Sequence, residues 1–248
     1  MVAVFIRELR AYYSSILAWT LIAIYLVIAG VMSSFTFDWF AELTMSAQRG
    51  MSDINMVERV VDPLMSTYGF LLLFFLPLLT MRLFSEEKRS GTLDLLLTYP
   101  LTEAQIIGGK LLATMTVVLL TLLFSACGWL VMAKFTTLEW QIILSGYIGL
   151  LLMSCSFVSF GLWTSSLSGS QLVSASLTYG GLLVSWILSA IVTASKVTEY
   201  VGDVSVPGNL SAFTKGVVDT QGIVFYLALS LFFLFLTARV LESRKWRG

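Results

Sequence analysis

The sequence predicts an all-α polytopic membrane protein with six membrane-spanning helices, and three observations carry this prediction. The chain has 248 residues, of which 57% are hydrophobic and only 12% are charged, whereas globular domains are about 25% charged. Uncharged runs recur that are long enough for helices of about 20 residues, the length needed to cross the hydrocarbon layer. The charged residues gather in the segments between these runs.

The chain begins with an amphipathic segment followed by a long apolar run. Residues 1–15 combine Arg7, Glu8 and Arg10 with apolar side chains, which predicts a helix lying along the membrane surface. The charge-free run 11–37 is longer than the apolar region of about 7–15 residues in a secretory signal peptide. We therefore expect an uncleaved first span.

The second span is expected over residues 63–81. Asp62 followed by Pro63 is typical of a helix start, with Asp62 as the N-cap. Pro77 lies inside this span, where a proline removes one backbone hydrogen bond. It predicts either tolerated curvature or a bend that shapes a translocation path.

A charged segment, residues 82–110, separates the second and third spans. A charged segment between two membrane spans must face water. Leu93, Leu96 and Leu97 would share one face of a helix, so we expect a short amphipathic helix over about 84–99 that can bind a soluble partner. The charged residues of the segment are Arg82, Glu86, Glu87, Lys88, Arg89, Asp94, Glu103 and Lys110.

The remaining spans follow from helix signals and from length. Thr102 and Gln105 fit a capping box at the start of the third span. The 56 residues of 140–195 carry no charge; as one helix they would measure about 84 Å, far more than a bilayer core of about 30 Å. The polar stretch 164–171 therefore predicts a turn.

A second polar connection, residues 196–219, precedes the last span and contains Leu210 and Phe213. It predicts short, partly inserted helices, with a solvated loop as the alternative. We expect one transmembrane domain over 1–248, with spans at about 16–37, 63–81, 111–133, 142–163, 172–194 and 220–240.

Small residues and tryptophans mark possible contact surfaces. Gly181, Ser185 and Ser189 recur every four residues, a spacing that lets helices approach closely. They predict packing within the bundle or, together with Pro77, a dimer-facing or path-lining surface. Four tryptophans near span ends are expected at the membrane interfaces: Trp129, Trp140, Trp163 and Trp186.

Basic residues predict the orientation. Six spans place both termini and the 82–110 segment on one side with ten basic residues, against five on the other. Positive residues favour the cytoplasmic side. Both termini and the charged segment are therefore expected in the cytoplasm.

The composition disfavours several functions. The chain has no histidine, the commonest metal ligand and general base. Its two cysteines, Cys127 and Cys155, lie in apolar runs and are expected to be buried thiols. Its net charge of zero disfavours nucleic-acid binding. Residues 104–111 approach a P-loop but have Ala104 and Leu111 in place of the required glycine and Ser/Thr.

No acidic or basic residue is expected inside a span. Ion-coupled carriers usually place such residues at bilayer depth, and an enzyme would need a catalytic group. The chain is therefore expected to be neither an enzyme nor an ion-coupled carrier, and any transport should take its energy from another protein.

The charged segment carries a family pattern. Residues 86–97 read Glu-Glu-Lys-Arg-Ser-Gly-Thr-Leu-Asp-Leu-Leu-Leu, followed by Pro-Leu-Thr at 100–102 and Ile-Gly-Gly-Lys at 107–110. This pattern, with its position between two spans, resembles the ABC-2 type transporter permeases over essentially the whole chain. Residues 213–219 and 224–226 also resemble the gliding-motility-associated branch of that family.

The resemblance implies a permease subunit of an exporter in the bacterial inner membrane, with outward re-entrant helices at 196–219. It implies two separate cytoplasmic ATPase subunits that bind ATP and magnesium, a second permease copy, identical or homologous, and no cofactor in this chain. The alternative is a membrane anchor that passes ATPase motion to an extracytoplasmic partner without moving cargo. The implied ATPase contacts in the coupling helix are Glu86, Glu87, Arg89, Gly91, Thr92, Leu93, Asp94 and Leu96.

Overall fold

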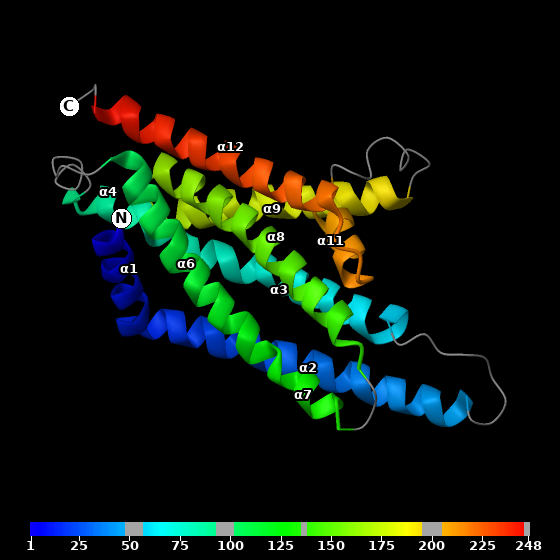
Figure 1. The fold of residues 1–248 in the computed structure, drawn as a ribbon. Coiled ribbons are helices and arrows are strands. Elements are labelled where there is room, and N and C mark those ends of the chain that lie inside the picture. Colours follow the sequence, from blue (N-terminus) through cyan, green and yellow to red (C-terminus); the bar gives the residue numbers. More distant parts are fainter. Residues whose placement is uncertain (48–56, 93–101, 135–137, 195–204, 246–248) are drawn as a thin grey trace.

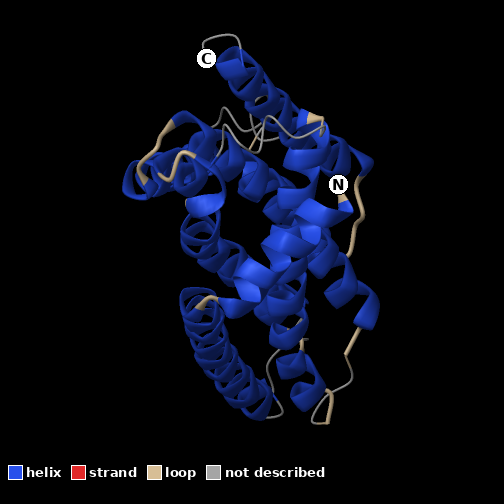
Figure 2. Cartoon of the chain, turned by 90° about the vertical axis from the view of Figure 1, so that its left-hand side faces the viewer, coloured by secondary structure: helices blue, strands red, loops and turns tan. Residues whose placement is uncertain are grey.

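The computed structural model describes residues 1–47, 57–92, 102–134, 138–194 and 205–245. Throughout these ranges the regular structure is helical, without a strand (Figure 2). Six helices in them are long and apolar enough to cross a membrane. The predicted all-α fold with six spanning helices is therefore confirmed.

The helices form an elongated bundle with both termini at one end (Figure 1). The amphipathic helix α1 ends at Ser14, and Ser15 connects it to the first spanning helix. The helices are α1 (Val2–Ser14), α2 (Ile16–Ala47), the π-helix η1 (Val57–Val61), α3 (Asp62–Thr80), α4 (Arg82–Arg89), α6 (Glu103–Ser125), α7 (Cys127–Met132), α8 (Trp140–Leu167), α9 (Gln171–Ala194), α11 (Val206–Thr214) and α12 (Thr220–Lys245).

Local sequence signals account for two of the helix ends. The capping box at the start of α6 is confirmed, because the Gln105 N–H donates to Thr102 Oγ1 and the Thr102 N–H donates to Gln105 Oε1. The predicted turn between α8 and α9 is also confirmed, at residues 168–170.

The predicted N-cap at Asp62 is wrong. The π-helix η1 runs directly into α3, and Val61 already has helical angles (φ −67°, ψ −51°). Asp62 is therefore the first residue of α3, and its Oδ1 accepts a hydrogen bond of 2.5 Å from the Thr214 hydroxyl of α11. Two other expectations are also wrong. Cys127, expected to be a buried thiol, is exposed. Trp129, expected at a membrane interface, is buried inside the bundle with only 1% of its surface exposed.

The core is built around α3 and α8, most of whose side chains lie inside the molecule, whereas α2, α9 and α12 are largely exposed. Large exposed apolar faces are normal for helices in lipid, because the acyl chains are as apolar as the side chains. Fully buried residues at the centre include Leu64, Leu72, Leu150, Phe157 and Val158.

Small residues set the closest helix contacts. A Cβ added to Gly161 of α8 would lie 2.2 Å from the Thr80 hydroxyl oxygen of α3, and one added to Gly149 would lie 2.7 Å from Cβ of Phe213 in α11. The glycines therefore allow α3 and α11 to lie directly against α8.

Helix α11 is the described part of the connection before the last span. It packs against α3, α8, α9 and α12, with Phe213 fully buried and Leu210 only 2% exposed. The Tyr226 hydroxyl of α12 donates to the Val206 carbonyl at 2.6 Å. This part is thus a helix inserted into the bundle; residues 195–204 lie outside the described ranges.

Candidate functional site

The candidate site surrounds α4, at the end of the bundle that also holds both termini (Figure 1). Helix α4 follows α3 after a single turn residue, Met81, which itself has helical angles (φ −53°, ψ −31°). Its inward residues, Leu83, Phe84 and Ser85, are buried. Bonds from α1, α6 and α8 converge on it.

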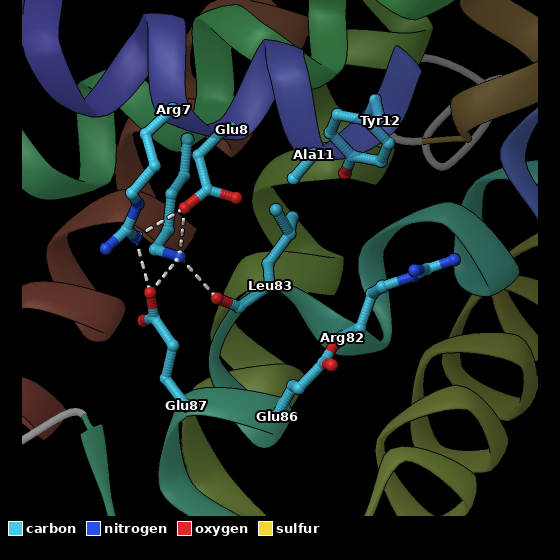
Figure 3. Close-up of a pocket in the computed structure, with 9 residues that line it drawn as sticks. Arg7, Glu8, Ala11, Tyr12, Arg82, Leu83, Glu86 and Glu87 are labelled. Carbon is cyan, nitrogen blue, oxygen red and sulfur yellow. Dashed lines mark hydrogen bonds and ion pairs between the residues drawn. The ribbon is translucent and has the colours of Figure 1, made fainter. Parts of the chain in front are cut away.

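A buried ion network joins α4 to α1 and α6 (Figure 3). The Lys110 ammonium of α6 lies 2.9 Å from Glu8 Oε1 and 3.1 Å from Glu87 Oε1, and it donates to the Leu83 carbonyl at 2.6 Å. The Lys110 side chain is only 1% exposed. The Arg7 guanidinium completes the network, because its Nη2 lies 2.6 Å from Glu8 Oε1 and 2.5 Å from Glu87 Oε1.

The network sets the charge of Glu8. Burial alone would raise the pKa of this carboxyl, but the attraction of Lys110 and the hydrogen bonds from Arg7 and Lys110 outweigh burial and lower the pKa. Arg7 shows the reciprocal effect, because burial would lower its pKa whereas Glu8 and Glu87 raise it. The charged forms therefore stabilise one another.

The two glycines before Lys110 let α1 approach α6. A Cβ on Gly109 would lie 2.9 Å from Cβ of Val4 in α1. Close approach of the two backbones brings Glu8 within reach of Lys110. At the other end of α1, the Tyr12 hydroxyl donates to the Leu79 carbonyl at 3.1 Å and lies 3.1 Å from Thr114 Oγ1.

A serine at the end of α8 bridges the junction of α3 and α4. Ser165 Oγ accepts hydrogen bonds from the N–H groups of Phe84 (3.0 Å) and Ser85 (3.1 Å) and donates to the Met81 carbonyl at 3.0 Å. Lys88 donates to the Ser166 carbonyl. These bonds join the end of α8 to the backbone at the start of α4.

A cavity of about 290 Å³ lies between α1 and α4. Within the described residues, Glu87 Oε2 is buried and accepts no hydrogen bond. Arg82 points away from the ion network (Figure 3) and donates to Ser15 Oγ at 2.9 Å. The cavity is lined by Arg7, Glu8, Ala11, Tyr12, Arg82, Leu83, Glu86, Glu87 and Lys110.

The expected ATPase contacts divide into three groups. Glu86, Arg89, Gly91 and Thr92 are exposed, whereas Glu87 points inward to Arg7 and Lys110. The remaining expected contacts, Leu93, Asp94 and Leu96, lie outside the described ranges.

The helix expected over residues 84–99 is described only in its first half. Helix α4 ends at Arg89, and Gly91 has a φ of +69°, a left-handed conformation that glycine adopts without a Cβ clash. Thr92 is the last described residue before 102.

The small residues of α9 face other helices of the same chain. A Cβ on Gly181 would lie 2.4 Å from Cζ of Phe160 in α8. Gly181 and Ser185 both line a cavity of about 270 Å³ formed with α8, α11 and α12, and Ser189 is only 6% exposed. Pro77 is buried within α3.

The sequence alone does not reveal the four residues that hold α4 in place. Arg7, Glu8 and Lys110 form the ion network, and Ser165 bonds to the backbone of α4. The sequence does show a charged amphipathic N-terminal segment and a lysine at the start of an otherwise uncharged span. These two features suggest an ion pair but do not indicate which residues form it.

Comparison with known families places the chain. A family model described as ABC-2 family transporter protein matches residues 43–215, a range that includes α3, α4 and α11. No curated protein matches the chain. Proteins of this family form the membrane component of ABC exporters, are not themselves catalytic and associate with ABC ATPases. With most of its length matched by that model, the chain belongs to the ABC-2 transporter family.

Proposed function

We propose that this chain is the permease subunit of an exporter in the bacterial inner membrane, driven by a separate cytoplasmic ATPase that docks on α4 and the segment after it. The observation that carries the proposal is the convergence of bonds on α4. Lys110 links it to α6, Arg7 links it to α1, and Ser165 links it to α8. A displacement of α4 would therefore move three other helices.

The two sides of α4 suit this role. The inward side combines buried Leu83 and Phe84 with Glu87, which is paired to Arg7 and Lys110 of the bundle. Glu86, Arg89 and Thr92, by contrast, are exposed. A surface with both charge signs favours a specific protein partner, because wrongly matched charges are penalised. The three residues are thus the described part of the proposed docking surface.

The proposed assembly has two permease copies, identical or homologous, and two ATPases that bind ATP and magnesium. ATP binding would bring the ATPases together and push on α4 in each copy. Cargo would leave between the two copies, along α2, α3 and α9. The large exposed faces of α2 and α9 support this arrangement, because they can accommodate a second copy.

The branch of the family is also proposed. The stretches 213–219 and 224–226 resemble the gliding-motility-associated permeases. An ATPase gene and gliding-motility genes beside the gene for this chain would support the branch. Loss of surface motility on deletion of the gene would test it directly.

Co-purification with the cognate ATPase tests the docking proposal. We expect Arg89→Glu and Glu86→Arg each to reduce the recovered complex at least tenfold without lowering the yield of the permease. Arg239→Glu is the matched control, because Arg239 is an exposed arginine on α12. Glu87→Arg is unsuitable because it would also break the ion network. An undiminished complex with both α4 variants would refute docking at this surface.

A further inference from the structure

Two charged residues of α4 stand outside the ion network. Arg82 and Glu86 both line the cavity of about 290 Å³ between α1 and α4 (Figure 3), yet neither forms an ion pair with another described residue. They are four residues apart and therefore share one face of the helix. Glu86 is exposed, and the partly buried Arg82 guanidinium donates to Ser15 Oγ at 2.9 Å. The cavity thus presents one cation and one anion that the described chain does not pair.

The charges around the cavity balance. Three basic and three acidic side chains line it, and four of the six neutralise one another in the ion network. A ligand with charge of one sign only would leave either Arg82 or Glu86 unpaired, whereas a zwitterion satisfies both. The volume of about 290 Å³ compares with about 30 Å³ for one water in the liquid, so the cavity has room for a small zwitterionic group.

An apolar cavity adjoins the charged one. It measures about 170 Å³ and is lined by residues of α1, α2 and α6, including Ile22 and Phe124. Tyr12 lines both cavities. Arg82 reaches the same border, because its partner Ser15 joins the α1 and α2 parts of the apolar lining. A charged cavity and an apolar cavity therefore lie next to each other.

The junction of α1 and α2 lies at the expected level of the membrane surface. The first helix that is long and apolar enough to span begins at Ile16. Trp19 Nε1 donates to the Tyr13 carbonyl at 2.9 Å, and both side chains are about half exposed. Tryptophan and tyrosine are enriched at the level of the lipid headgroups. A phospholipid at this level has its headgroup beside the charged cavity and its acyl chains beside the apolar one.

We propose that the two cavities together bind one phospholipid whose headgroup carries a primary ammonium, as in phosphatidylethanolamine. The phosphate pairs with the Arg82 guanidinium, whose planar donors match phosphate geometry. The ammonium donates to the Glu86 carboxylate, and an acyl chain lies in the apolar cavity. The ammonium of phosphatidylcholine has no N–H to donate, and phosphatidylglycerol has no ammonium. The site should therefore prefer phosphatidylethanolamine to both.

Native mass spectrometry of the purified full chain tests this preference. No ATPase is present, so the outcome does not depend on the proposed docking surface, to which Glu86 also belongs. The three lipids, with identical acyl chains, are titrated separately. We expect phosphatidylethanolamine to bind about tenfold more tightly than either other lipid, the effect of one hydrogen bond to a charged group. Equal or tighter binding of either other lipid would overturn the proposal.

Substitutions locate the headgroup. Glu86→Gln and Arg82→Gln should each weaken the binding of phosphatidylethanolamine about tenfold. Glu242→Gln and Arg239→Gln are the matched controls, because these two residues form an exposed ion pair on α12. Undiminished binding by Glu86→Gln would refute the headgroup assignment. Because Glu86 is exposed, this variant decides the question even if Arg82→Gln does not fold.

Two further measurements distinguish a lipid from a free headgroup. Ile22→Trp enlarges a side chain in the lining of the apolar cavity and should weaken lipid binding while the preference for phosphatidylethanolamine persists. Water-soluble phosphoethanolamine has the same charged groups but no acyl chains, and it should not displace the lipid even in large excess. Unchanged lipid binding by Ile22→Trp, or displacement by phosphoethanolamine, would overturn the lipid assignment.

Discussion

At the scale of single residues, Lys110 is the unusual side chain. A fully buried ammonium is tolerated only when paired and hydrogen-bonded, and Lys110 meets both conditions through Glu8, Glu87 and the Leu83 carbonyl. Its position at the start of α6 brings it to α4 and α1 together. The pairing could not be predicted from the sequence, because Glu8 lies on a separate helix far along the chain.

Replacement of Lys110 by methionine should destabilise the chain. The change leaves two largely buried carboxylates with only the half-exposed Arg7, and breaking a buried ion pair costs about 3–5 kcal/mol. Thermal unfolding in detergent measures the effect. Arg239→Met is the control, because its pair with Glu242 is exposed and such pairs contribute about 0–1 kcal/mol. Equal Tm losses in the two variants would contradict the structural role of the network.

Acid should remove the contribution of Glu8. Its pKa in the folded chain is lower than the ordinary 4.5, so its stabilisation is complete above about 4.5 and is lost as the pH falls through the folded value. The Tm difference between the unmodified chain and Glu8→Gln should be constant between pH 7 and 5 and shrink below 4.5. A difference that stays constant down to pH 3 would refute this linkage.

At the scale of elements, helix existence and helix packing differ in how far they follow from sequence. Apolar length predicted the spanning helices, and Thr102 with Gln105 predicted where α6 begins. Burial did not follow, because a lipid-facing residue and a core residue are equally apolar. Cys127 was therefore expected inside and is exposed, whereas Trp129 was expected at an interface and is buried.

The sites of closest packing within the bundle provide an element-scale prediction. Gly181→Ala should destabilise the contact between α9 and α8, because its Cβ would lie 2.4 Å from Phe160. Gly180→Ala is the adjacent control, since nothing lies within 4 Å of its added Cβ. We expect a lower Tm for Gly181→Ala only, because overpacking lowers the free energy of unfolding by about 1–3 kcal/mol. A neutral Gly181→Ala would mean that α9 is not held against α8.

The hydrogen bonds between α8 and α4 provide a second prediction at the scale of elements. Ser165→Ala removes the acceptor of the Phe84 and Ser85 N–H groups, so α4 should transmit motion poorly. If α4 couples the ATPase to the bundle, the complex should still form while cargo export falls. Ser176→Ala is the control, because Ser176 is an exposed serine of α9 that bonds only within its own helix. Export by Ser165→Ala at the rate of the unmodified chain would show that the bonds from α8 to α4 are not needed to pass ATPase motion to the bundle.

At the scale of the whole molecule, orientation is the prediction on which the proposed function rests. The termini, α4 and the α8–α9 turn share one end of the bundle (Figure 1), and ten of the fifteen basic residues belong to that side. The positive-inside rule therefore predicts that α4 faces the cytoplasm, the compartment in which the proposed ATPase would lie.

Single cysteines can test this orientation after both native cysteines are replaced by serine. Thr92→Cys marks the end next to α4, and Lys215→Cys marks the opposite end, after α11; both positions are exposed. In intact cells a membrane-impermeant maleimide should label Lys215→Cys and not Thr92→Cys, and in inverted membrane vesicles the pattern should reverse. Labelling of Thr92→Cys from outside intact cells would place α4 beyond the reach of any cytoplasmic ATPase, and the export proposal would fail even though the fold and the family membership would stand.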